Sequence, residues 1–212
     1  MQHDVLLFDL DGTLSDPLPG IAACINYSLS HFGHATWSES ALASFIGPPL
    51  DRSFQQILGR CTEEEISALV LKYRERYQQV GYAENRLYEG IVESLHFLEK
   101  AGAVMAICTS KPAYLAQKIL QHFALSRYFT FVSGGGIGVE KWQQIATLKR
   151  EGHISNRSLM IGDRAVDLRA AHQNGLQSAA VLWGYGSIDE LQHEAPAHYF
   201  HQACDFQQLI QC

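Results

Sequence analysis

The stretch DLDGTLSD at residues 9–16 decides the fold and the chemistry of this chain. It overlaps the end of VLLFDL at residues 5–10, a continuously apolar run typical of a strand buried on both faces. Asp9 and Asp11 therefore fall where a buried strand ends. Burial of carboxylates is costly unless they meet a cation or take part in chemistry. An Asx turn is the structural alternative, but three more polar clusters at predicted strand ends favour a functional site.

Four further runs have continuous apolar or β-branched character, and segments with helical spacing lie between them. The predicted strands are 103–109, 128–133, 158–162 and 179–183, and the predicted helices are 91–100, 113–124, 140–151 and 167–174. Alternating strands and helices predict an α/β fold with a parallel sheet and right-handed crossovers.

The segment between the first strand and this alternating region has a different pattern. Helical spacing occurs at residues 20–32, 38–45, 50–58 and 63–79, without a convincing strand. We therefore expect two domains: a core made of residues 1–16 and 86–212, and a helical insert over residues 17–85.

Three polar clusters follow other predicted strands. Thr109 and Ser110, in CTSKP at 108–112, offer a hydroxyl and backbone N–H groups suited to an oxyanion. Lys141 follows the glycine-rich segment GGGIGVE and could reach a phosphate, with Lys111 and Lys149 as competing candidates. GDRAVD at 162–167 adds two carboxylates, Asp163 and Asp167, one helical turn apart.

Carboxylates gathered at one edge of a sheet repel each other strongly, and a hard divalent cation bound through oxygen relieves that repulsion. Mg²⁺ suits a phosphate site because it needs only one or two carboxylates besides the phosphate and water. The residues alone therefore indicate a magnesium-assisted phosphoryl site.

The order DxDGT, a strand ending in Thr/Ser, Lys, and GDxxxD resembles the haloacid dehalogenase superfamily over nearly the whole chain. The resemblance implies a doubly wound, Rossmann-like sheet with the first strand central, and a helical C1 cap inserted after it. DGTLSDP, FIGPPL, TSKP and GDR resemble the phosphoglycolate phosphatase-like branch, and VLWGYGSIDEL at 181–191 is similar to 5'-nucleotidase-like members.

The resemblance also implies roles for individual residues. Asp9 would be the nucleophile that forms a phosphoaspartate, and Asp11 would be the general acid and base. The Asp9 carboxylate, the Asp11 backbone carbonyl and Asp163 would bind Mg²⁺. Thr109, the Ser110 backbone amide and Lys141 would bind the phosphate, and Asp167 and Thr13 would orient the groups that bind the metal and the phosphate.

The expected activity is thus Mg²⁺-dependent hydrolysis of a small phosphomonoester. A sugar phosphomutase, which uses the same acids, and a non-catalytic phosphate-binding regulatory domain are the alternatives. In the insert, Gly47-Pro48-Pro49 is expected to form a stiff turn. Arg52 could then bind an anionic leaving group or remain solvated.

Composition limits the partners that we expect. Sixteen basic and 22 acidic residues give a net charge of −6, which argues against a nucleic-acid polymer or an anionic membrane as partner. The five scattered cysteines and the N-terminal sequence, which does not resemble a signal peptide, favour a cytoplasmic protein with reduced thiols. We expect a small phosphorylated substrate and a monomer or homodimer.

Overall fold

The computed structural model describes residues 2–46, 50–136 and 138–210. The chain divides into two compact units. The first, here called the core unit, is formed by Met1–Asp16 and Leu87–Cys212, and the second, here called the helical unit, by Pro17–Arg86. Each unit is described by itself.

A parallel sheet of six strands forms the centre of the core unit, in the order β5-β4-β1-β6-β7-β8. The strands are β1 (Leu6–Phe8), β4 (Met105–Thr109), β5 (Val132–Gly134), β6 (Leu159–Gly162), β7 (Gln177–Val181) and β8 (His198–Phe200). β1 pairs with β4 on one side and with β6 on the other. The predicted α/β fold with a central first strand is confirmed.

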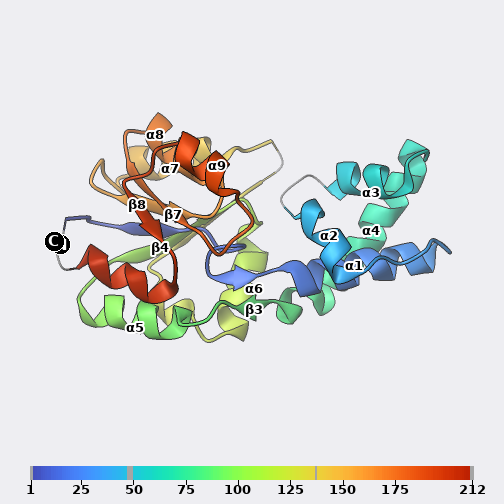
Figure 1. Ribbon diagram of the computed structural model, residues 1–212, viewed down its shortest axis with the longest axis horizontal. Helices are drawn as coiled ribbons and strands as arrows, with labels where there is room; N and C mark the ends of the chain where they lie inside the picture. Colours follow the sequence, from blue (N-terminus) through green and yellow to red (C-terminus); the bar gives the residue numbers. More distant parts are fainter. Residues whose placement is uncertain (1, 47–49, 137, 211–212) are drawn as a thin grey trace. The chain divides into compact units, whose positions relative to one another are not determined.

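Helices cover both faces of this sheet (Figure 1). They are α5 (Ile91–Lys100), α6 (Ala113–His122), α7 (Lys141–Arg150), α8 (Ala165–Gln173), α9 (Ile188–His193) and the 3-10 helix η4 (Ala203–Leu209). Successive residues of β1 point to opposite faces. Leu7 packs in a cluster with Ile145 of α7 and Ala171 of α8, whereas Phe8 packs against Phe206 of η4. Both residues are fully buried, which explains the unbroken apolar run.

Two parts of the core unit differ from the predicted elements. The run at 128–133 was expected to be a strand, but Ser126–Tyr128 forms a 3-10 helix, η3, and β5 starts only at Val132. The first two aromatic residues of the run pack in the core, since Tyr128 is buried and Phe129 contacts Phe8 edge-on. Backbone pairing with β4 begins only at Thr130, whose N–H donates to the Met105 carbonyl at 2.8 Å. The sequence did not predict β8, because its three residues have mixed polarity and are too few to show the apolar periodicity of a strand.

The helical unit contains the helices that the insert was expected to form. They are α1 (Leu18–His31), α2 (Glu39–Leu42), η1 (Ala43–Phe45), α3 (Leu50–Leu58), α4 (Glu63–Gln79) and η2 (Gly81–Glu84). Its own apolar core includes Ile25, Leu42, Phe54 and Leu69. Arg52 is exposed on α3, and the expected Gly47-Pro48-Pro49 turn lies outside the described residues.

The chain leaves and re-enters the core unit at neighbouring points. β2 (Ser15–Asp16) and β3 (Arg86–Leu87) form a two-stranded sheet at these crossings. Just inside the core unit, the Tyr88 N–H donates to the Leu14 carbonyl at 3.2 Å. The insertion therefore leaves the sheet of the core unit uninterrupted.

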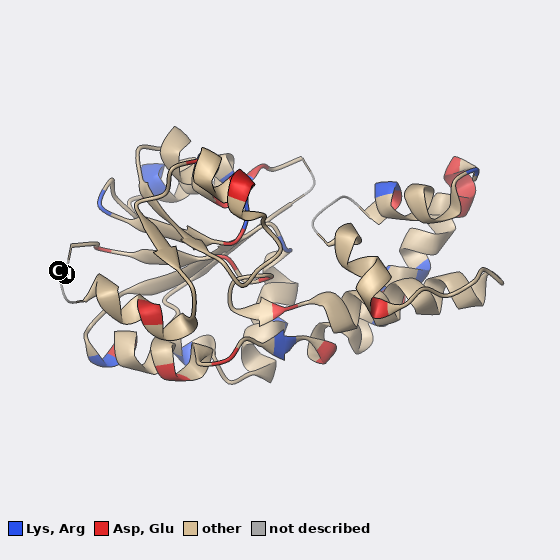
Figure 2. Cartoon of the chain, viewed as in Figure 1, with Lys and Arg blue, Asp and Glu red and all other residues tan. Residues whose placement is uncertain are grey.

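Basic and acidic positions are interspersed on the helices of both units (Figure 2). Within the described ranges, no helix combines the length and the apolar character that a membrane span requires.

Candidate active site

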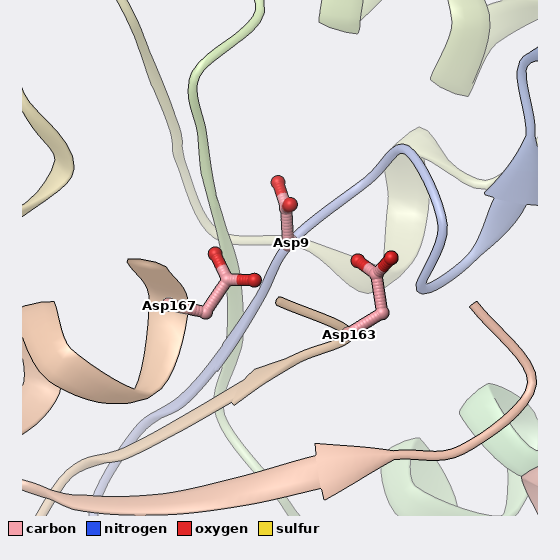
Figure 3. Close-up of side chains that lie close together, drawn as sticks. All are labelled: Asp9, Asp163 and Asp167. Atoms are coloured by element: carbon pink, nitrogen blue, oxygen red, sulfur yellow. The ribbon is translucent and has the colours of Figure 1, made fainter. Parts of the chain in front are cut away.

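Three carboxylates from different elements converge at one edge of the core sheet. Asp9 follows β1, Asp163 follows β6, and Asp167 lies in the first turn of α8. One oxygen from each lies within 4.8 Å of the others, and Figure 3 shows the side chains pointing to the same side. Their exposed fractions are 8%, 1% and 0%, respectively. Because the strands are parallel, this edge is where an open α/β sheet binds its ligands.

Lys141 supplies positive charge to this cluster. It is the first residue of α7, and its Nζ lies 3.1 Å from Asp9 Oδ2 and also donates to Asp167 Oδ1. The side chain is 1% exposed. Of the competing lysines, Lys149 donates instead to the carbonyl of Asn174 at 2.6 Å.

Asp11 forms a second ion pair beside the cluster. Lys111 Nζ lies 2.8 Å from Asp11 Oδ2. The other oxygen, Oδ1, is buried and has no hydrogen-bond partner within the described residues, and the same holds for Asp9 Oδ1. Two buried carboxylate oxygens thus remain available for a ligand.

Burial dominates the electrostatics of these acids. It raises the pKa of Asp163 to about 8, with further increases from the charges of Asp167 and Asp9. Burial also raises the pKa of Asp167, to about 6, although Lys141 opposes the change. The pKa of Asp11 is raised by burial against the opposing charge of Lys111.

The pKa of Lys141 moves in the direction that favours its charge. Burial alone would lower this pKa, but the charges of Asp167 and Asp9 outweigh burial and raise it above the usual value. Lys141 therefore stays an ammonium group and stabilises the ionised forms of both carboxylates.

Asp163 is held by one side-chain hydroxyl and one backbone N–H from two neighbouring loops. Thr13 Oγ1 donates to Asp163 Oδ1 at 3.2 Å, and the Tyr185 N–H donates to Oδ2 at 2.9 Å. Gly12 and Gly184 lie so close to Asp163 that no side chain fits at either position. A Cβ added at Gly12 would lie 2.1 Å from Asp163 Oδ2, and a Cβ added at Gly184 would lie 2.2 Å from the Asp163 Cβ. These contacts fix the carboxylate without a charged partner.

The other predicted phosphate residues lie on the adjacent strand. Thr109 is the last residue of β4, which pairs with β1, and its Oγ1 accepts from the Lys111 N–H at 3.3 Å. Ser110 follows it and is exposed. The structure therefore places every predicted core-unit site residue at or beside the same sheet edge; their catalytic roles stay predictions.

The segment Trp183–Gly186 is a part of the site that the sequence reasoning did not identify. Besides the Tyr185 contact with Asp163, Trp183 Nε1 donates to the Thr13 carbonyl at 3.0 Å. Tyr185 also donates its hydroxyl proton to Asp16. The alternating glycines in WGYG directly after β7 were the available signal, because glycine marks close backbone approach.

Comparison with known proteins agrees with this arrangement. Residues 6–181 match the family model for haloacid dehalogenase-like hydrolases. A protein named 5'-nucleotidase from Pseudomonas aeruginosa is 37% identical, with 100% of this chain and 97% of that protein aligned. A protein from Mycobacterium tuberculosis named tyrosine-protein kinase PtkA is 31% identical, over 94% of this chain and 69% of that protein.

Two further proteins, one compared by sequence and one by structure, are similar to this chain over most of its length. A protein named phosphoglycolate phosphatase from Agrobacterium fabrum is 29% identical, over 89% of this chain and 84% of its own length. The solved structure of a haloacid dehalogenase-like family hydrolase from Streptococcus pneumoniae is 26% identical, covers 99% of both chains and has a TM-score of 0.89. The chain therefore belongs to the haloacid dehalogenase-like hydrolases and is a phosphatase-type enzyme of that family.

Proposed function

We propose that this protein hydrolyses a small phosphomonoester through a phosphoaspartate formed on Asp9, with Mg²⁺ as cofactor. The observation that carries the proposal is the position of Asp9. Its carboxylate is adjacent to the Lys141 ammonium group and to two further buried carboxylates, and one of its oxygens is unpartnered among the described residues. A nucleophile needs such a free oxygen.

The donor set fits Mg²⁺. The candidate ligand atoms of the cluster are all carboxylate oxygens, and hard cations prefer oxygen ligands. With all groups ionised, four carboxylates (Asp9, Asp11, Asp163, Asp167) and two ammonium groups (Lys111, Lys141) leave a charge of −4 + 2 = −2. A divalent cation balances that charge. The Asp9 carboxylate, the Asp11 backbone carbonyl and Asp163 would hold it, and when bound it neutralises charge on the transferring phosphoryl group.

The side chains divide the remaining work. The Asp9 carboxylate attacks phosphorus, and Asp11 protonates the leaving oxygen. Asp11 then accepts a proton from the water that hydrolyses the phosphoaspartate. Thr109, the Ser110 amide and Lys141 bind the phosphate oxygens and stabilise their charge in the transition state.

Names of the relatives suggest the substrate class. Proteins named 5'-nucleotidase and phosphoglycolate phosphatase are both similar to this chain, and both names refer to small phosphomonoesters. We therefore propose a nucleoside monophosphate or a short phosphorylated acid as substrate. The helical unit would act as the cap that selects the leaving group, with Arg52 as a candidate for binding its negative charge.

Phosphate release from a panel of monoesters tests the proposal. We expect turnover with Mg²⁺, loss of turnover with EDTA, and a decrease of at least about 10³-fold in Asp9→Asn, since the nucleophile is removed. Asp189→Asn, an exposed carboxylate on α9, is the matched control and should retain activity. Turnover that persists in EDTA or in Asp9→Asn contradicts the mechanism.

Analysis of the reaction products and of ligand binding separates the two alternatives. Accumulation of a bisphosphorylated sugar would identify a phosphomutase. Binding of Mg²⁺ and inorganic phosphate without turnover of any monoester would identify a regulatory domain.

A further inference from the structure

The two oxygens of the Asp11 carboxylate have different environments. Oδ2 lies 2.8 Å from Lys111 Nζ, whereas Oδ1 is buried and lacks a hydrogen-bond partner in the described part of the chain. The Lys111 side chain is 8% exposed. Partial exclusion of water strengthens this ion pair relative to one on the surface. Lys111 therefore restrains Asp11 through one particular oxygen.

The backbone around Lys111 is fixed from both sides. Its N–H donates to Thr109 Oγ1 at 3.3 Å, and its carbonyl accepts from the Gly135 N–H at 2.9 Å. Gly135 packs so tightly that an added Cβ would lie 2.2 Å from the Ser110 carbonyl oxygen. The glycine-rich segment thus holds the backbone of Lys111 in place, which limits where its ammonium group can lie.

The chemistry of an ammonium group makes the two Asp11 oxygens inequivalent. Lysine has three N–H donors and no acceptor, so the carboxyl oxygen that faces it must accept. When Asp11 carries a proton, that proton is therefore on Oδ1.

We propose that Lys111 is a positioning residue that presents Asp11 Oδ1 to the leaving oxygen of the substrate. This inference rests on the proposed function, in which Asp11 is the general acid. In that step an Asp9 oxygen bonds to phosphorus and the bond from phosphorus to the leaving oxygen breaks. The electron pair stays on the leaving oxygen, which takes the proton from Asp11 Oδ1. Lys111 keeps its own protons.

Leaving groups of different acidity test this role. For Lys111→Met we expect kcat/KM for propyl phosphate to fall about 10- to 100-fold, because an alkoxide must be protonated as it leaves. For p-nitrophenyl phosphate, whose leaving group is a stable anion, kcat/KM should change less than about threefold. Lys111→Arg retains the positive donor and should preserve the wild-type ratio of the two values.

One measurement shows that the Lys111 variants are intact, and a control variant shows that the effect is specific to Lys111. Stabilisation by Mg²⁺ in thermal unfolding should equal that of the wild type. Lys149→Met, which removes a hydrogen-bonded lysine outside the site, is the matched control and should keep the wild-type kcat/KM ratio.

Three results overturn the inference. One is an equal loss of kcat/KM for propyl and p-nitrophenyl phosphates in Lys111→Met. Another is an increase in KM confined to phosphoglycolate, which would mean that Lys111 binds a carboxylate of the leaving group. The third is a Lys111→Arg variant that behaves like Lys111→Met.

Asp11→Asn separates failure of this inference from failure of the proposed function. If the wild type hydrolyses no phosphomonoester of the panel, nucleoside monophosphates included, or if Asp11→Asn keeps the wild-type ratio, the proposed function itself is wrong. If Asp11→Asn loses the alkyl substrate selectively and Lys111→Met does not, only the role of Lys111 is wrong.

Discussion

Asp163 is a residue at which the proposed metal site and the stability of the fold are linked. Its carboxylate is 1% exposed, lies near two other acids, and receives only a threonine hydroxyl and a backbone N–H. No cation of the chain pairs directly with it in the described structure. The ionised form is therefore costly in the metal-free protein and becomes favourable when a divalent cation binds.

This leads to a prediction for the pH dependence of stability. The folded protein keeps Asp163 protonated up to a pKa of about 8, whereas the unfolded chain releases that proton near 3.8. The metal-free free energy of unfolding should thus fall by about 2 kcal/mol between pH 6 and pH 8. Urea unfolding in EDTA measures this change.

Mg²⁺ and Asp163→Asn provide the controls for that experiment. Saturating Mg²⁺ should stabilise the protein more at pH 8 than at pH 6, because ligands must be deprotonated to bind it. In Asp163→Asn, the free energy of unfolding of the metal-free protein should depend much less on pH between pH 6 and pH 8. A slope that persists in this variant would show that another group titrates.

Sequence reasoning succeeded for residues whose spacing is fixed by a strand end or a helical turn. Asp9, Asp163 and Asp167 follow from this local geometry, and parallel strands bring their positions together. The pairing of Lys111 with Asp11 could not be predicted, because it depends on the path of the 109–111 loop against the glycine-rich segment. For the same reason the sequence left three lysines open as phosphate ligands.

At the level of elements, the turn after β1 and the loop after β7 each bring a glycine into close contact with Asp163. Gly12 has φ = +82° and faces the carboxylate at close range. Gly102, in the same unit, has φ = +78°, but a Cβ added there would have no atom within 4 Å. The two positions share backbone conformation and differ only in packing.

We predict that Gly12→Ala abolishes Mg²⁺ binding and activity, since the methyl group would displace the Asp163 carboxylate. Gly102→Ala should cost about 1 kcal/mol of stability through backbone strain alone and retain full activity. Calorimetric titration with Mg²⁺ and phosphate release measure both variants. Equal behaviour of the two would show that strain, and not contact with Asp163, matters at Gly12.

The elements that were predicted correctly are those with long or unambiguous patterns. β1, β4 and β6 are buried on both faces, and their apolar runs are unbroken. The start of β5 was predicted too early, because a turn that contains aromatic residues packed on the core has the same composition as a strand. Tertiary packing decides between these outcomes.

At the scale of the whole molecule, each unit has its own apolar core. The proposed metal ligands all come from the core unit, so Mg²⁺ binding is expected to depend on that unit alone. Turnover is expected to need both units if the helical unit acts as the proposed cap.

Phe54→Ala tests this division of function. Phe54 is fully buried in the helical unit, and its truncation should destabilise that unit by about 3–5 kcal/mol. We expect phosphate release to fall while Mg²⁺ affinity remains unchanged. Phe97→Ala, at a position of α5 that is 36% exposed, is the control in the core unit. Undiminished turnover by a protein with an unfolded helical unit would contradict the cap role.

The paired crossings at Ser15–Asp16 and Arg86–Leu87 have an evolutionary consequence. Because the inserted chain starts and finishes at adjacent points, another module with closely spaced ends could replace it without altering the sheet. If the helical unit acts as the proposed cap, recombination can thus change substrate selection while the core sheet and its carboxylate cluster are inherited intact.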